Sequence, residues 1–275
     1  MTGAYTRRMA ARDPLDDFAV RTFTHDGKQR RVFTAGTGPA VIVMAEMPGI
    51  TPRVADFARR VVGLGCSVWM PDLFGVAGEP AGGVAYLRSL PAACVSRDFA
   101  AFAAGTTAPV VGWLRALAAE AHGVCGGPGV GAVGMCFTGG FALGMMVDDR
   151  MLAPVLSQPS LPIVVPWRKG NAAEVGLSPA DRARVAERAA QGVCALGLRF
   201  TGDPLVPAER FDALSALLGE SFIAVEIDSS PSNPNGIGRR AHSVLTEELV
   251  EHAGHPTNDA LNEVLSFLAE RLLTN

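Results

Sequence analysis

Hydrophobic residues in this chain gather in short, nearly continuous runs that end at glycine, proline or polar clusters. Runs of this kind, rich in valine and alanine, are typical of strands that are buried on both faces of a parallel sheet. We expect such strands to form the centre of the fold. They are Ala40–Ala45, Cys66–Met70, the run that begins at Val130, Ala153–Ser157, Val193–Phe200 and Ser221–Ile227.

Segments with helical hydrophobic spacing lie between these runs. The predicted helices are Pro52–Leu64, Ala92–Ala104, Pro109–His122, a helix that begins at Gly139, Pro179–Gln191, Pro207–Leu218 and Asn258–Leu273. Arg21–His25 and Arg30–Thr34 flank the turn signal Asp26-Gly27, which predicts a β-hairpin. Strands that alternate with helices predict an α/β fold, with a mostly parallel central sheet and helices on both faces.

The pattern contains neither an internal repeat nor a linker, so we expect one domain. Residues 1–20 form a predicted N-terminal arm, and residues 21–275 form the domain itself. Within this domain, the segment Gln158–Gln191 is predicted to leave the sheet as a cap-like excursion, which would bring Trp167, Arg168 or Lys169 near a pocket.

Composition narrows the classes of partner. The chain has 275 residues, 48% of them hydrophobic, and a net charge of −3, which gives no reason to expect nucleic acid or an anionic membrane as a partner. Its apolar stretches are too short for a signal peptide or a membrane span. The five cysteines include no C-x-x-C pair, so neither a zinc ribbon nor a thioredoxin-type site is indicated. Free thiols favour a cytoplasmic location.

The stretch from Val130 to Gly140 contains the strongest chemical signal. A buried strand ends there at Gly134-Met135-Cys136, and a helix begins at Gly139. A sharp strand-to-helix turn lifts its central side chain clear of the sheet, and the helix N-terminus favours a thiolate at that position. We therefore interpret Cys136 as a nucleophile. The alternative is an inert buried cysteine that packs as a small hydrophobic residue.

A cysteine nucleophile needs a base and an acid that orients the base. On an α/β-hydrolase frame both follow the nucleophile, in loops at the carboxyl ends of strands. Asp203 follows the strand Val193–Phe200, and His242 lies in the loop after the last strand. The alternatives are a turn-forming aspartate before a proline and a surface histidine. His252 and His255 form an H-x-x-H pair without carboxylate or thiol neighbours, which is a weak metal signal.

Glu46 is a carboxylate at the end of the buried strand Ala40–Ala45, where burial is costly unless the charge is paired. On the same frame this loop contributes an oxyanion-binding N–H, here from Met47, and the second N–H comes from Phe137. The alternative for Glu46 is a salt bridge to a surface arginine. The G-x-G-x-x-G pattern from Gly129 to Gly134 enters a strand instead of following one, so it does not indicate dinucleotide binding.

With these residues in this order, the chain resembles the dienelactone hydrolase family of α/β-hydrolases from about Arg21 onward. The motifs that carry the resemblance are Ala45-Glu46-Met47-Pro48-Gly49, Pro71-Asp72-Leu73-Phe74, Gly134-Met135-Cys136-Phe137-Thr138-Gly139-Gly140, Thr201-Gly202-Asp203-Pro204-Leu205-Val206-Pro207 and Ala241-His242-Ser243. Thr138 departs from the family pattern, because a glycine is usual at that step of the turn.

The resemblance implies a carboxymethylenebutenolidase-like ester hydrolase that cleaves a lactone or small ester without a metal or organic cofactor. Cys136 would attack the carbonyl, His242 would act as base and then acid, and Asp203 would hold the imidazole. Glu46 would hydrogen-bond the nucleophile and help to take its proton. The protein would be a monomer or homodimer with a small-molecule substrate.

The family's grip on a substrate carboxylate is less well matched. Arg97 is the candidate for the first of its two arginines. Thr246 stands where the second is expected, unless Arg239 or Arg240 reaches into the site. Two alternatives therefore stay open. One is a general carboxylesterase for uncharged esters, and the other is a non-catalytic or thiol redox-regulatory protein in which Cys136 binds a ligand or senses oxidation.

Overall fold

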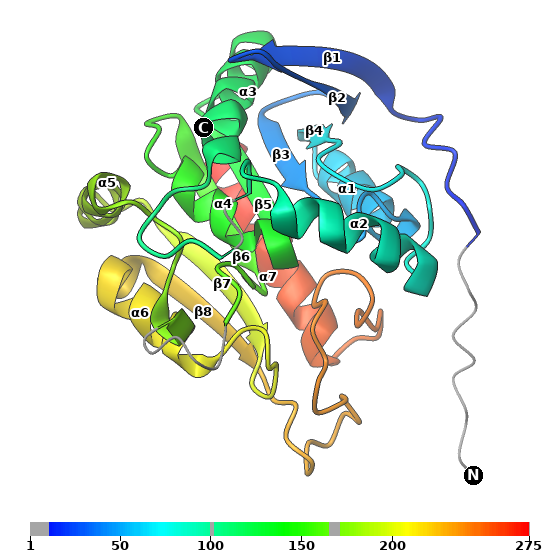
Figure 1. Ribbon diagram of the computed structural model, residues 1–275, viewed down its shortest axis with the longest axis vertical. Coiled ribbons are helices and arrows are strands. Elements are labelled where there is room, and N and C mark those ends of the chain that lie inside the picture. The colour runs from blue at the N-terminus through cyan, green and yellow to red at the C-terminus, as the bar shows by residue number, and fades with distance from the viewer. Residues whose placement is uncertain (1–10, 100–101, 165–170, 275) are drawn as a thin grey trace.

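The computed structural model describes residues 11–99, 102–164 and 171–274, leaving aside the side chains of residues 90–95. Its strands form one eight-stranded sheet in the order β1-β2-β4-β3-β5-β6-β7-β8 (Figure 1). They are β1 (Ala19–His25), β2 (Lys28–Ala35), β3 (Ala40–Met44), β4 (Ser67–Pro71), β5 (Val130–Met135), β6 (Met151–Ser157), β7 (Ala195–Phe200) and β8 (Phe222–Ile227). From β4 to β8 all neighbours are parallel, whereas β2 is antiparallel to both β1 and β4. The predicted sheet and the hairpin are thereby confirmed.

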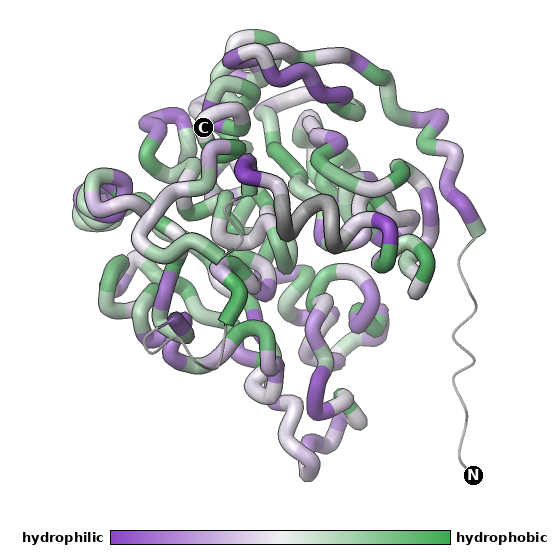
Figure 2. Tube along the Cα trace, in the orientation of Figure 1, coloured by the Kyte–Doolittle hydropathy of each residue, from purple (hydrophilic) through white to green (hydrophobic). Residues whose placement is uncertain are grey.

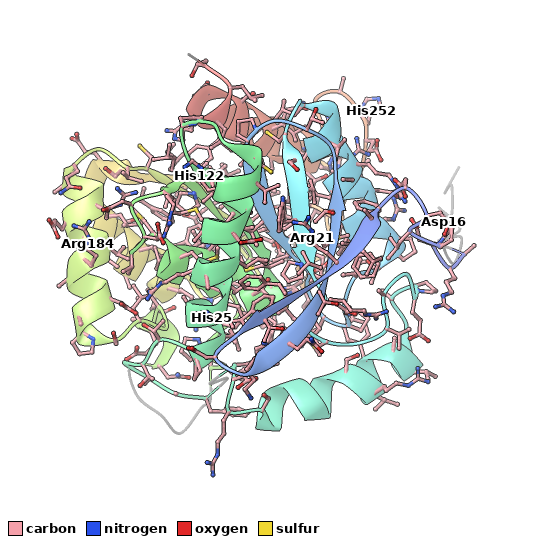
Figure 3. The ribbon with its side chains drawn as sticks, turned by 90° about the horizontal axis from the view of Figure 1, so that it is seen from above. Asp16, Arg21, His25, His122, Arg184 and His252 are labelled. Carbon is pink, nitrogen blue, oxygen red and sulfur yellow. The ribbon has the colours of Figure 1, made fainter. Side chains whose placement is uncertain are left out.

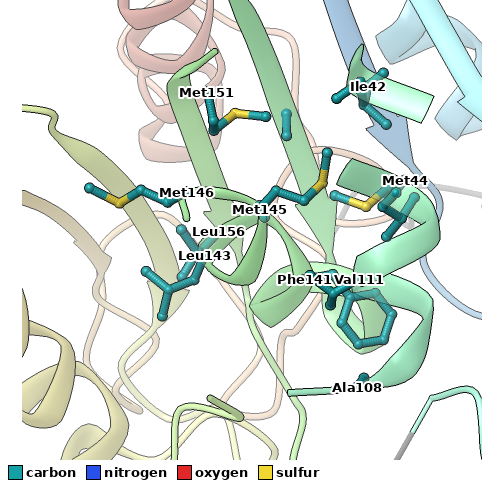
Figure 4. Close-up of a cluster of buried hydrophobic side chains, with 14 of the residues drawn as sticks. Ile42, Met44, Ala108, Val111, Phe141, Leu143, Met145, Met146, Met151 and Leu156 are labelled. Atoms are coloured by element: carbon teal, nitrogen blue, oxygen red, sulfur yellow. The ribbon is translucent and has the colours of Figure 1, made fainter. Parts of the chain in front are cut away.

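Helices cover both faces of this sheet. The helices are α1 (Pro52–Gly63), α2 (Gly83–Val95), α3 (Pro109–Cys125), α4 (Gly139–Met145), α5 (Pro179–Ala190), α6 (Ala208–Leu218) and α7 (Pro256–Leu272), with short 3-10 turns η1 (Cys136–Thr138), η2 (Asn171–Ala173) and η3 (Gly219–Ser221). One apolar cluster joins the sheet to α3, α4, α5 and α6, and the other joins it to α1 and α7. The first cluster is drawn in Figure 4.

The side-chain alternation of a strand explains why two cores are needed. All five residues of β3 are buried, and successive side chains point to opposite faces. Ile42 and Met44 belong to the cluster under α3 and α4, whereas Val41 and Val43 belong to the cluster under α1 and α7. Figure 2 shows the consequence along the chain, with hydrophobic colours in the central strands and hydrophilic colours in the outer hairpin.

Three helices begin at the same local signal, an N-cap side chain followed by proline. The Thr51 hydroxyl accepts a hydrogen bond from Val54 N–H at the start of α1. Ser178 caps α5 in the same way, and the His255 side chain caps α7. This role accounts for one histidine of the H-x-x-H pair, which serves a helix terminus here.

The predicted helix Ala92–Ala104 is wrong, because α2 spans Gly83–Val95 and the chain turns at Ser96. The Ser96 hydroxyl accepts a hydrogen bond from Asp98 N–H, which closes a local turn. The Asp98 carboxylate pairs with Arg30 at 2.9 Å and with Lys28 at 3.2 Å, both from β2. These contacts join segments that are distant in sequence, and they hold residues 96–98 in a turn instead of a helix.

The structure describes part of the predicted N-terminal arm and part of the predicted excursion Gln158–Gln191. Of the predicted arm, residues 11–18 lie against α1, with Leu15 and Phe18 buried. The Arg59 guanidinium forms ion pairs with the carboxylates of Asp13 (2.7 Å) and Asp17 (2.8 Å), and these pairs lower the pKa of both aspartates.

Past β6, the excursion contains η2 and α5, and α5 is the helix that connects β6 to β7. Trp167, Arg168 and Lys169 lie outside the described residues.

Candidate active site

Cys136 lies at a tight corner between β5 and α4. Its φ angle is +51°, in the left-handed region that non-glycine residues rarely adopt. The chain folds so closely here that a Cβ at Gly134 would lie 2.3 Å from the carbonyl oxygen of Thr138. The half-buried Cys136 side chain is therefore held at the carboxyl edge of the sheet, as the sequence predicted.

Thr138, the departure from the family pattern, has a structural role. Its buried hydroxyl accepts a hydrogen bond from Met135 N–H at 2.9 Å and lies 3.0 Å from the Met44 carbonyl, to which it donates. A glycine could make neither contact. The hydroxyl thus ties the corner that carries Cys136 to the end of β3, where Glu46 follows.

Asp203 and His242 lie together, as expected from their loop positions. The distance from His242 Nδ1 to Asp203 Oδ2 is 2.6 Å, and the Asp203 side chain is fully buried. Its other oxygen accepts a hydrogen bond from Leu205 N–H at 2.9 Å. Asp203 thus forms the turn before Pro204 and also orients the imidazole, so the two interpretations of this residue are compatible.

The second ring nitrogen, His242 Nε2, is buried and has no hydrogen-bond partner among the described residues. Burial lowers the pKa of His242, but a Cys136 thiolate and the Asp203 carboxylate outweigh burial, and the net direction is upward. Cys136 therefore lies close enough to act on the ring, although its sulfur makes no hydrogen bond to Nε2 by geometry. Such contacts are often long or poorly aligned in a protein without its substrate.

Glu46 does not make the surface salt bridge that was its alternative role. The residue is 3% exposed, and three neutral groups donate to its carboxylate. They are Ser243 Oγ (2.7 Å), Gln158 Nε2 (3.2 Å) and Thr246 Oγ1. Burial raises the pKa of Glu46, against the opposing effect of Thr246, Ser243 and the His242 charge. Its hydrogen bonds therefore go to the His242 loop and to the end of β6, and none of them goes to the Cys136 sulfur.

The two expected oxyanion donors belong to adjacent loops. Met44 of β3 pairs with Gly134 of β5 in the parallel sheet, so the segments that follow these strands leave the sheet side by side. Phe137 follows Cys136 at the beginning of η1, where the first N–H groups of a helical turn have no intrahelical partner. The N–H groups of Met47 and Phe137 remain the predicted oxyanion site.

The arginines expected to grip a carboxylate lie elsewhere. The side chains of Arg97, Arg239 and Arg240 are exposed, and the structure gives no ion pair between them and the site. Thr246 stands at the position of the missing arginine and is buried against Glu46.

Three other histidines lie apart from one another in the fold. His25, His122 and His252 come from three different elements, namely the outer hairpin, α3 and the loop before α7 (Figure 3).

A cavity of about 380 Å³ lies between β2, α2 and the loop after β4. Phe74 and Phe99 line it, and their rings also pack edge-on against Phe137, at 5.8 and 5.4 Å between centroids. The cations of the cavity have carboxylate partners, since Arg30 pairs with Asp98 and Arg88 with Glu79.

Within the described ranges, no cluster of three metal-ligating side chains is found, and no helix there has the length and apolarity to cross a bilayer.

Four residues of the site were not predicted from the sequence. Gln158 and Ser160 follow β6, and Ser243 and Thr246 follow His242. The signal that could have found the first two is their position, because polar residues after a buried parallel strand gather at the edge where the other loops meet.

No family profile matches the sequence, and no curated protein does. Solved structures match its fold over most of the chain. A protein of Klebsiella pneumoniae, provisionally assigned as a dienelactone hydrolase, is 15% identical over 92% of this chain and 98% of its own, with a TM-score of 0.62. A dienelactone hydrolase-like promiscuous phosphotriesterase from metagenomic libraries is 16% identical over 93% and 99%, with a TM-score of 0.55.

A cold-adapted esterase from an Arctic intertidal metagenomic library is 16% identical over 92% of each chain, with a TM-score of 0.54. The chain has the α/β-hydrolase fold. The sheet order, the corner at Cys136 and the likeness to these solved structures all support this.

Proposed function

We propose that the protein hydrolyses carboxylic esters or lactones through Cys136, in the manner of the dienelactone hydrolase family that its motifs resemble. The observation that carries the proposal is the convergence at one edge of the sheet: a cysteine at a left-handed corner, beside an imidazole that is hydrogen-bonded to a buried carboxylate. The fold likeness to proteins described as dienelactone hydrolases and as an esterase supports the same reaction class.

In this mechanism, the Cys136 thiolate attacks the carbonyl carbon, and the negative charge moves to the carbonyl oxygen. The N–H groups of Met47 and Phe137 stabilise that oxyanion. The C–O bond then breaks, and the His242 imidazolium gives its proton from Nε2 to the departing alkoxide. In the second half, His242 removes a proton from water, the hydroxide attacks the thioester carbon, and thiolate departs.

Asp203 keeps the Nδ1 proton on the ring, so that Nε2 always faces the reacting atoms. It also stabilises the imidazolium charge. The raised pKa of His242 fits this cycle, because it favours the imidazolium that gives its proton to the leaving group. The Glu46 carboxylate and the His242 imidazolium favour each other's charged form, and the burial of Glu46 opposes this effect.

The test is turnover of p-nitrophenyl acetate by Cys136→Ala, with Cys194→Ala as the control for a half-buried cysteine far from the corner. We expect turnover to be abolished in the first variant and unchanged in the second. Full turnover by folded Cys136→Ala would refute the proposal. If turnover is absent in the wild type and peroxide converts Cys136 to a sulfenate or a disulfide, the thiol redox-regulatory alternative holds instead.

Among substrates, the structure favours uncharged esters. The three candidate arginines for a carboxylate are exposed, and a neutral threonine occupies the place of the second of the family's two arginines. We expect p-nitrophenyl acetate to be cleaved at least as well as mono-p-nitrophenyl succinate, with Arg97→Ala leaving the ratio unchanged. A strong preference for the succinate that is lost in Arg97→Ala or Arg240→Ala would instead support the carboxylate-binding role.

A further inference from the structure

The loop after β6 approaches the nucleophile from a side that the mechanism above does not use. β6 runs parallel to β5, with Ser157 paired to Met135, so this loop begins beside the Cys136 corner. Ser160 N–H donates to the Cys136 carbonyl at 3.0 Å. The approach depends on Gly139, where a Cβ would lie 2.6 Å from Cα of Pro159.

The side chain of Ser160 faces the sulfur. Its Oγ lies 3.5 Å from Cys136 Sγ, which is within hydrogen-bond range for sulfur, and the residue is 8% exposed. A hydroxyl can donate or accept, whereas a thiolate can only accept. Whenever Cys136 is a thiolate, Ser160 is therefore the donor.

Arg210 holds this loop from behind. The residue lies on α6 and is 1% exposed, yet its guanidinium binds no carboxylate among the described residues. It donates instead to three carbonyl oxygens, those of Pro159 (2.8 Å), Pro162 (2.7 Å) and Glu174 (3.0 Å).

Burial lowers the pKa of Arg210 to about 10, so the cation persists at neutral pH. A planar guanidinium with its donors in a fixed fork suits such bridging, and the two carbonyls of Pro159 and Pro162 flank Ser160.

We propose that Ser160 is a further catalytic residue, which donates a hydrogen bond to the Cys136 sulfur whenever that sulfur is a thiolate, and that Arg210 is its positioning residue. The inference rests on the proposed function. The proton stays on Ser160 Oγ throughout, so no new bond is made or broken there. The interaction is strongest at the two stages when sulfur carries negative charge, before attack on the ester and again when the thioester is cleaved.

The second stage is where this hydrogen bond accelerates the reaction. When hydroxide has added to the thioester, the tetrahedral intermediate must expel sulfur as a thiolate. A donor aimed at the sulfur stabilises that leaving group. Without it, hydrolysis of the acyl-enzyme slows, and the acyl-enzyme accumulates.

The other titratable groups near the Cys136 sulfur can be distinguished from Ser160 by their contacts. His242 faces it from the loop after β8 and is itself paired with Asp203. Glu46 is turned toward its three donors, and Arg210 lies behind the Ser160 backbone. Removing one hydroxyl therefore changes one contact of the sulfur and leaves the hydrogen bond between His242 and Asp203 in place.

The experiment compares Ser160→Ala with Ser215→Ala, an exposed serine on α6, as the matched control. The first measurement is the rate of iodoacetamide alkylation of Cys136 against pH. A hydrogen bond to a charged group is worth about one to two pH units in the midpoint of that profile. We expect the midpoint to rise by about that amount in Ser160→Ala and to stay in place in Ser215→Ala.

The second measurement is pre-steady-state turnover of p-nitrophenyl acetate. Ser160→Ala should release a burst of p-nitrophenol followed by a steady rate at least about tenfold lower than in the wild type. An unchanged midpoint and steady rate in folded Ser160→Ala, with turnover still lost in Cys136→Ala, would overturn this inference alone. Turnover that survives in Cys136→Ala would overturn the proposed function, whatever the alkylation profile shows.

Discussion

The buried carboxylate Glu46 gives a prediction about stability that does not depend on any substrate. The perturbation is Glu46→Gln, which keeps the shape and removes the charge. The donors from Ser243 and Thr246 are hydroxyls, which can accept as well as donate, so a glutamine amide can replace the carboxylate among them. The variant should therefore fold.

The direction of the effect follows from the raised pKa of Glu46, whose main cause is burial. In the unfolded chain a glutamate titrates near about 4.3. Below that pH both states hold the proton, and the contribution of the protonated side chain is complete. As pH rises, the unfolded chain loses its proton first, so the wild type loses stability until the pH passes the folded pKa. The slope in this window reaches about 1.4 kcal/mol per pH unit. Glutamine does not titrate.

The assay is urea unfolding of wild type and Glu46→Gln between pH 4.5 and 8, at constant ionic strength. We expect the free energy of unfolding of the wild type to fall relative to that of the variant as pH rises. Glu270→Gln, which removes an exposed partner of Arg271, should show no such trend. A difference between wild type and Glu46→Gln that is independent of pH, or that grows in favour of the wild type at high pH, would refute the reasoning.

Three other outcomes follow from contacts at the site and its support. Asp203→Asn should lower kcat for p-nitrophenyl acetate by about 10- to 150-fold, because the charged hydrogen bond to His242 is worth about 1.5–3 kcal/mol. Equal kcat in a folded variant would show that this pair does not act in catalysis. Gly134→Ala should lower the free energy of unfolding by about 1–3 kcal/mol, since its Cβ would meet the Thr138 carbonyl at 2.3 Å. Gly112→Ala, in open space on α3, should raise the free energy of unfolding by about 0.5–1 kcal/mol in the same urea titration. The measurement must show opposite signs for the two glycines.

Much of the fold could be predicted from the sequence because its signals are local. Continuous apolar runs indicated the parallel strands, and Asp26-Gly27 indicated the hairpin. Cys136 and Asp203 come just past a strand, and His242 lies in the long loop after the last strand. This order placed them at one edge because parallel strands share a carboxyl end. Asp203 and His242 are bonded there, and their catalytic roles, with that of Cys136, remain predictions.

The features that could not be predicted depend on contacts between distant segments. The helix expected over Ala92–Ala104 is displaced because Asp98 pairs with residues of β2, and helical periodicity carries no information about such a pair. The partners of Glu46 come from two loops that are more than a hundred residues away along the chain. Arg210 has no motif at all, because a guanidinium that binds only carbonyl oxygens is recognisable solely from its neighbours.

The arm along α1 has a consequence for how the protein loosens in acid. Arg59 lowers the pKa of Asp13 and Asp17, so these carboxylates stabilise the docked arm above the pH at which free aspartate titrates, and that stabilisation disappears as pH falls through their folded values. Leu15 and Phe18 then remain as its apolar anchors. A protease that is active at a pH below about 3.9, where free aspartate titrates, should therefore trim the amino-terminal end first, while the sheet stays intact.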